Sequence, residues 1–160
     1  MPNMQNEKTP MPLQEGLVRI TNFDEVALGY TEEQMMNEAE RCLHCVNHPC
    51  TAGCPVSVMI PDFKTGNIDE AYGVITKTNS FPSICGRVCP QENQCEKNCV
   101  RAIRGEAVAI GRLERYVADH HTPSVPEKPQ ANGMKVAVVG SGGFGMRRGS
   151  GQGRLCGYDL

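Results

Sequence analysis

The stretch RCLHCVNHPCTAGCP, residues 41–55, places four cysteines within thirteen positions and a proline directly after the last of them. A second run, CGRVCPQENQCEKNC at residues 85–99, contains four more. Of the nine cysteines in the chain, only Cys156 lies outside these two runs. At this density the fold depends on what the thiols bind, and three uses compete: disulfides, zinc and iron–sulfur clusters.

Disulfides are disfavoured by the compartment that the sequence indicates. The N-terminal residues MPNMQNEKTPMPLQEG are polar and lack the apolar stretch of a secretory signal, so we expect a cytoplasmic chain. Thiols stay reduced in that compartment. Structural zinc usually takes two C-x2-C pairs, and this chain has a single one, at Cys42 and Cys45. Zinc therefore remains the main rival to iron.

The spacing of the first run favours iron–sulfur ligation. It reads C-x2-C-x4-C-x3-C-P, two residues longer in the middle than the C-x2-C-x2-C-x3-C-P run of bacterial two-cluster ferredoxins. In those ferredoxins the fourth cysteine binds a different cluster from the first three. By the same logic Cys42, Cys45 and Cys50 would share one cluster, and Cys54 would belong to a second. The spacing leaves open which later cysteine completes which cluster.

The composition is consistent with a domain that metal helps to hold together. Among the 160 residues, 39% are hydrophobic, 5% are aromatic and none is Trp, which is a lean supply for an apolar core. A net charge of −2 gives no electrostatic case for nucleic acid or an anionic membrane surface. No apolar run is long enough to span a bilayer. We therefore expect neither nucleic acid nor membrane as a partner.

Hydrophobic periodicity predicts a mainly α fold around the two cysteine runs. Thr31 and Gln34 have the spacing of a capping box, which predicts a helix that leads to Cys42. Asn67 is a predicted cap of a later helix. The predicted segments are an extended arm at 1–30, a short turn at 60–63, helices at 68–79 and 106–121, a linker at 122–133 and a strand at 135–140.

Four longer stretches resemble a known family: NEAERCLHC, CPVSVMIPDF, FPSICGRVCPQENQCEKNC and EAVAIGRLERYVAD. Together they resemble the N-terminal iron–sulfur domain of NADPH-dependent glutamate synthase small chains. Dihydropyrimidine dehydrogenase and the large subunit of bifurcating ferredoxin:NADP transhydrogenase share that domain. The arm PMPLQEGLVRITNFDEVALGYTEEQ is closer to the glutamate synthase and transhydrogenase members. The resemblance implies an α-helical ferredoxin-type domain with two 4Fe–4S clusters at 31–121, followed by an FAD domain.

The resemblance also implies a ligand set that interleaves the two cysteine runs. Matched residue by residue, the first cluster is bound by Cys42, Cys45, Cys50 and Cys99, and the second by Cys54, Cys89, Cys95 and Glu114. Glu114 stands where the pyrimidine enzyme has a glutamine, and a carboxylate ligand would add negative charge and lower the reduction potential. Cys85 has no ligand role in this scheme. The alternative is two groups of four cysteines, with Cys85 a ligand and Glu114 a bystander on a helix face. Arg87, between two cysteines, is the best candidate to stabilise cluster charge.

The C-terminal residues 134–160 have the features of an incomplete FAD-binding domain. Gly140, Gly142 and Gly145 follow the predicted strand with the GxGxxG spacing of a dinucleotide-binding loop. MRRGSGQGRLCG, at 146–157, stands in place of an apolar helix, and we hypothesise that a reading-frame disturbance scrambled it. We therefore expect this chain alone to bind no FAD and to oxidise no NADPH.

The function that the resemblance implies is electron transfer through two 4Fe–4S clusters, in the N-terminal part of an FAD- and NADPH-dependent oxidoreductase. Glutamate synthase is the favoured parent. There, electrons would pass from NADPH through FAD and the clusters to an FMN-containing, glutamate-forming large subunit. Two alternatives stay open: a subunit of bifurcating transhydrogenase, and a stand-alone electron-transfer module without catalysis.

Overall fold

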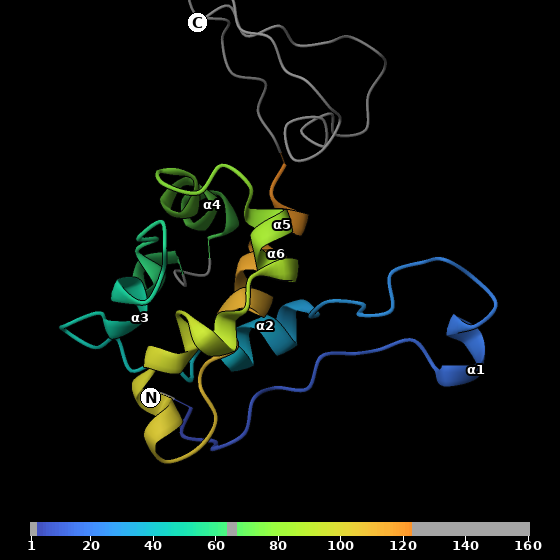
Figure 1. The fold of residues 1–160 in the computed structure, drawn as a ribbon, viewed down its shortest axis with the longest axis horizontal. Coiled ribbons are helices and arrows are strands. Elements are labelled where there is room, and N and C mark those ends of the chain that lie inside the picture. The colour runs from blue at the N-terminus through green and yellow to red at the C-terminus, as the bar shows by residue number, and fades with distance from the viewer. Residues whose placement is uncertain (1–2, 64–66, 123–160) are drawn as a thin grey trace, which may run out of the picture. The chain divides into compact units, whose positions relative to one another are not determined.

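The computed structural model describes residues 3–63 and 67–122 (Figure 1). Within these residues the elements are helices, and the one β-type contact is an isolated bridge between Leu13 and Ala27. This confirms the mainly α fold class for the described part. The predicted linker, the strand at 135–140 and the glycine loop lie outside it. None of the helices in the described ranges has both the length and the apolar character that a membrane crossing requires.

Six α-helices and four 3-10 helices follow one another in the described ranges. They are α1 (Gly16–Arg19), α2 (Glu32–Ala39), α3 (Pro49–Ala52), η1 (Ile60–Phe63), α4 (Ile68–Thr76), α5 (Pro82–Val88), η2 (Gln91–Asn93), η3 (Glu96–Asn98), η4 (Val100–Ile103) and α6 (Ile110–His120). The predicted turn at η1 and the predicted helix at α4 are confirmed. The Asn67 side chain caps α4 by accepting the N–H groups of Asp69 and Glu70, at 3.0 and 3.3 Å. Helices α1 and α5 have no counterpart in the sequence predictions.

Helix α2 starts at the predicted capping box. Thr31 Oγ1 accepts the N–H of Gln34 at 3.3 Å, and Gln34 Oε1 accepts the N–H of Thr31 at 2.9 Å. These bonds satisfy N–H groups that have no partner within the helix itself. The helix buries Met35 and Ala39, and the N–H of Cys42 then donates to the carbonyl of Ala39 at 3.1 Å. The helix therefore sets where the first cysteine lies.

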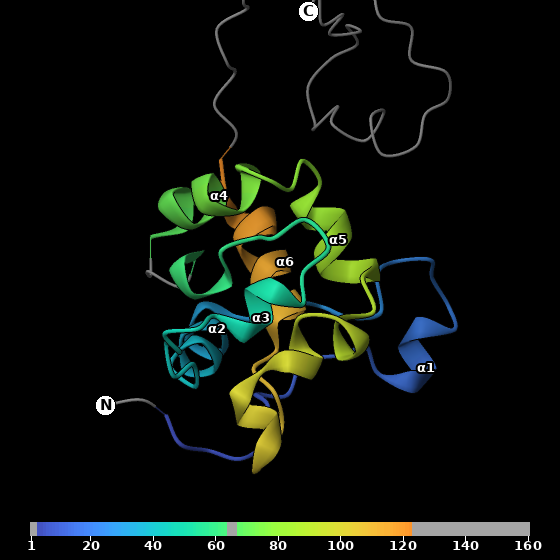
Figure 2. The same cartoon turned by 60° about the vertical axis from the view of Figure 1, so that its left-hand side comes forward.

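Residues 12–28 form an arm that carries α1 at its tip, apart from the other helices (Figures 1 and 2). The arm was predicted to be extended, and α1 adds one short helix to it. Two backbone bonds close its base, from the N–H of Gln14 to the carbonyl of Val26 and from the N–H of Leu28 to the carbonyl of Pro12. Glu25 of the arm pairs with Arg87 at 2.7 Å, which ties the base to α5.

Helix α6 lies between α4 and α5 (Figure 2) and presents Ile110, Leu113 and Val117 to the core. It begins at Ile110 and not at residue 106 as predicted, because Glu38 of α2 and Arg41, just after α2, hold the preceding backbone in another conformation by hydrogen bonds to residues 106, 107 and 109. Gly86 explains how closely α5 packs on α6. A Cβ atom at Gly86 would lie 2.7 Å from the backbone nitrogen of Arg115, so a larger residue would push the two helices apart.

A buried ion pair joins α2 to the segment before α6. Glu38 and Arg41 are both 0% exposed, and Arg41 Nη1 donates to Glu38 Oε1 at 2.6 Å. Glu38 also accepts the backbone N–H groups of Thr9 (2.6 Å) and Ala109 (2.8 Å). The Arg41 guanidinium donates to the carbonyl oxygens of Gln5, Asn6, Glu106 and Ala107. The pair therefore connects the N-terminal residues, α2 and residues 106–109.

Replacing Arg41 with leucine should destabilise the protein by roughly 3–5 kcal/mol, because the Glu38 carboxylate then stays buried without its charge partner. Thermal unfolding of anaerobically prepared protein, followed by circular dichroism at a fixed scan rate, measures the effect. Arg87→Leu is the matched control, since this partly exposed arginine forms ion pairs that contribute about 1 kcal/mol or less. Equal falls in melting temperature would contradict the role of the buried pair.

Candidate functional site

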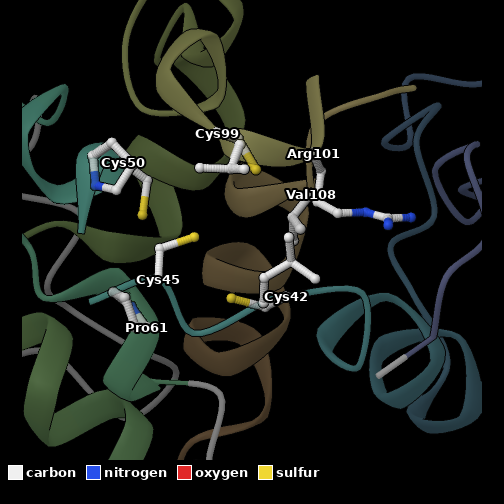
Figure 3. Close-up of a pocket in the computed structure, with 10 residues that line it drawn as sticks. Cys42, Cys45, Cys50, Pro61, Cys99, Arg101 and Val108 are labelled. Carbon is white, nitrogen blue, oxygen red and sulfur yellow. The ribbon is translucent and has the colours of Figure 1, made fainter. Parts of the chain in front are cut away.

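Four cysteines from distant parts of the chain border one cavity. They are Cys42, Cys45, Cys50 and Cys99, and Figure 3 shows their sulfur atoms facing a common space. The rest of the wall is mostly apolar and comes from Leu43, Pro49, Pro61, Val100, Arg101 and Val108. The structure thus brings together the four residues that the family resemblance assigns to the first cluster.

The loop between α2 and α3 positions the first three of these cysteines. His44 and His48 have positive φ angles, 48° and 40°, which reverse the chain on either side of Cys45. Histidine is among the residues that adopt this conformation more often than most. The N–H of His44 also donates to Cys42 Sγ at 3.4 Å. Such a bond would stabilise the charge of a metal-bound thiolate.

A second cavity is bordered by four thiols and one carboxyl group: Cys54, Cys85, Cys89, Cys95 and Glu114. The volume of this cavity is ≈ 960 Å³, and that of the first cavity is ≈ 310 Å³. Both values include the part of the cavity that is open to solvent. Cys85 and Cys89 come from α5 and its end, and Glu114 comes from α6. The four predicted second-cluster residues therefore lie together, and Cys85 lies with them.

The two cavities are direct neighbours. Four short segments contribute to both: residues 50–54, 60–61, 95–99 and 108–110. Each of these segments has five residues or fewer, so its two ends lie at most about 14 Å apart even if the backbone is fully extended. The residues of 108–110 are almost fully buried, with exposed fractions of 2%, 0% and 3%. Buried protein from this segment therefore borders both cavities.

Three groups at the second cavity, Cys89, Cys95 and Glu114, have raised pKa values, which favours their neutral forms. Burial raises the pKa of the Cys95 thiol to about 12, with a further contribution from the Glu96 charge. Burial and the neighbouring Cys85 raise the pKa of Cys89 to about 11. Burial also raises the pKa of Glu114 to about 7, and a hydrogen bond from Asn79 opposes that shift. Each group would bind a metal in its ionised form. A positively charged centre would therefore offset the free-energy cost of ionising these buried groups.

The arrangement of the donors fits a polyatomic cluster. The thiols surround two cavities, with one carboxyl group among them. Thiolates are the ligands that hold iron–sulfur clusters. The residues present therefore suit such a cluster at each cavity.

The structure does not place Arg87 where it could stabilise the charge of a cluster, as the sequence predicted. Its guanidinium pairs with Glu25 at 2.7 Å and with Asp119 at 2.8 Å, because α5 directs it toward the arm and the end of α6. Its charge is thereby neutralised away from the cavities. Arg101 is the arginine that borders the first cavity, and Figure 3 shows its guanidinium pointing away from the sulfur atoms. It donates to the carbonyl of Gln5, so Arg101 closes the wall with its aliphatic stem.

The chain is similar in sequence to known proteins. A family model described as dihydropyrimidine dehydrogenase domain II, 4Fe-4S cluster, matches residues 19–125. The glutamate synthase [NADPH] small chain of Azospirillum brasilense is 38% identical over 138 residues, which cover 80% of this chain and 28% of the relative. The small chain of Escherichia coli K12 is 37% identical over 138 residues, with 81% and 29% covered. These matches confirm the resemblance seen in the motifs.

A relative of a different name matches at lower identity. The NAD-dependent dihydropyrimidine dehydrogenase subunit PreT of Salmonella typhimurium is 31% identical over 132 residues, which cover 78% of this chain and 32% of the relative. The chain thus spans about a third or less of the length of these curated relatives.

Replacing Cys99 with serine should remove about half of the protein's iron, because the cavity that this residue completes would lose one of four thiolate ligands. Iron and acid-labile sulfide analysis of anaerobically purified protein measures the loss. Cys156→Ser is the matched control, since this cysteine lies outside both runs and should retain all the iron. Full iron content in Cys99→Ser would show that the grouping around the first cavity is wrong.

Proposed function

The chain belongs to the 4Fe–4S cluster family described as dihydropyrimidine dehydrogenase domain II, and we propose that it transfers single electrons through two such clusters. The observation that carries this proposal is the division of the donors between two neighbouring cavities. Four thiols border one cavity, and four thiols with one carboxyl group border the other.

The ligand set of the proposal follows the two cavities. The first cluster is assigned to Cys42, Cys45, Cys50 and Cys99, and the second to Cys54, Cys89, Cys95 and Glu114. The burial of Glu114 supports its place in the set, because a carboxyl group with a pKa raised to about 7 gains most from a bound cation. Cys85 borders the same cavity and is the competitor for this position.

The chain's own residues would hold, shield and separate the two clusters. When bound, each cluster takes up and releases one electron. Val58, Ile60 and Ile110 are nearly fully buried in the wall of the second cavity and would limit the access of water. The apolar wall of the first cavity would do the same, and the His44 N–H would offset thiolate charge. Limited hydration and backbone donors are the usual means by which a protein tunes such a cluster.

Glutamate synthase is the parent enzyme that the relatives favour. Several are small chains of the NADPH-dependent enzyme, from Azospirillum brasilense, Escherichia coli and Bacillus subtilis. In such a parent, electrons would pass from NADPH through FAD to the clusters, and then to an FMN-containing, glutamate-forming large chain. Gly140, Gly142 and Gly145 would belong to the FAD site, and they lie outside the described residues. A reducing cytoplasm would suit the eight clustered thiols.

Other parents share the same domain. The match to PreT supports a pyrimidine-reducing assembly, and the arm sequence also suits a bifurcating transhydrogenase. A stand-alone electron carrier is the non-catalytic alternative. NADPH- and glutamine-dependent formation of glutamate by the protein in its native assembly would select glutamate synthase, and its absence would exclude it.

Anaerobically purified protein should contain about eight iron and eight acid-labile sulfide per chain, since two 4Fe–4S clusters supply that number. Removal of the metal should also unfold the region between about residues 40 and 115, because ligand binding and folding are coupled in small domains with lean cores. Elemental analysis and circular dichroism check the two parts. Stoichiometric zinc without sulfide would refute the proposal.

A further inference from the structure

Asn79 lies between the two residues that compete for the fourth position at the second cavity. It is 6% exposed and borders that cavity. Its Nδ2 donates to Glu114 Oε1 at 2.6 Å, and its Oδ1 accepts from the Cys85 thiol at 3.5 Å. One side chain therefore contacts both candidate ligands and is itself neither a thiol nor a carboxyl group.

The backbone of α5 fixes which way the Asn79 amide faces. Its Oδ1 also accepts the N–H of Phe81 at 2.9 Å, in the turn that leads into the helix. A backbone N–H can only donate, so the amide oxygen must lie on this side and the NH2 group must face Glu114. The opposite orientation would place a donor against a donor.

The two ends of the Asn79 amide make different hydrogen bonds to Glu114 and Cys85. The NH2 group only donates, so it matches the ionised Glu114 that would bind iron. The oxygen accepts the hydrogen bond from the Cys85 sulfur at 3.5 Å, which holds that sulfur at the amide. Cys89 is a further neighbour of the Cys85 thiol on α5 and belongs to the assigned ligand set.

We propose that Asn79 is a positioning residue that selects Glu114 over Cys85 as the fourth ligand of the second cluster. The inference rests on the proposed function and its ligand set. Such selection has a chemical reason, because a soft thiolate is otherwise the preferred ligand of an iron–sulfur cluster. Asn79 holds the Glu114 carboxylate at the cavity with the shorter hydrogen bond and holds the Cys85 sulfur through its oxygen.

The test asks whether replacing Asn79 changes the ligand that the second cluster requires from Glu114 to Cys85. Asn79→Ser keeps an oxygen that can accept the Phe81 N–H, so α5 retains its start. The shorter side chain withdraws from both Glu114 and Cys85. Glu114→Ala and Cys85→Ser are then made in the native and in the Asn79→Ser background. Iron, sulfide and the electron paramagnetic resonance (EPR) spectrum of the reduced protein are measured after anaerobic purification.

In the native background, Glu114→Ala should lose about half of the iron and Cys85→Ser should lose none. In the Asn79→Ser background the pattern should reverse, with Cys85→Ser costly and Glu114→Ala tolerated. Asn79→Ser alone should keep its iron and show a changed EPR signal from one cluster, because a thiolate replaces a carboxylate. A purely structural role for Asn79 would not reverse the pattern.

Four results would overturn the inference, and they separate it from the proposed function. The same pattern in both backgrounds, or iron loss in Asn79→Ser alone, would remove the selecting role and leave the ligand set intact. Iron loss in Cys85→Ser but not in Glu114→Ala, in the native background, would overturn the ligand set and the inference with it. Native protein without iron and sulfide would overturn the proposed function itself.

Discussion

The ion pair between Glu38 and Arg41 is the interaction on which the rest of the domain depends. Removing two charges from water costs several kcal/mol for each ion, and here backbone groups from both ends of the described chain offset that cost. Cys42 follows directly in sequence, and Ala109 precedes α6. One interaction therefore locates the first thiol, the segment between the cavities and the helix that carries Glu114.

The thiols have two roles in this domain, in packing and in the proposed binding of clusters. Cys42, Cys50, Cys54 and Cys99 pack against the apolar core, which has few large side chains of its own. The donors that would hold the clusters are therefore also part of what holds the helices together, in keeping with the coupling of metal binding to folding. Because segments 50–54, 95–99 and 108–110 border both cavities, a change at one would reach the other.

Local patterns predicted the elements whose physics is local. The Thr31–Gln34 capping box and the Asn67 cap both depend on residues three apart or fewer. Spacing grouped Cys42, Cys45 and Cys50 and set Cys54 apart. The later residues at each cavity followed only from family resemblance, because spacing cannot say which distant thiols meet. Glu38 and Arg41 resemble an ordinary exposed pair in sequence, and their burial depends on the returning N-terminal residues. The sequence did not reveal the roles of Arg87 and Asn79 for the same reason, since their partners come from distant parts of the chain.

The interleaving of the two cysteine runs also has a consequence for when the protein can mature on the ribosome. Cys42, Cys45 and Cys50 are synthesised 49 or more residues before Cys99, with which they share a cavity. At about 5–20 residues per second, translation of that interval takes roughly 2–10 seconds. A cluster held by Cys42, Cys45, Cys50 and Cys99 would therefore be inserted only after both cysteine runs have been translated.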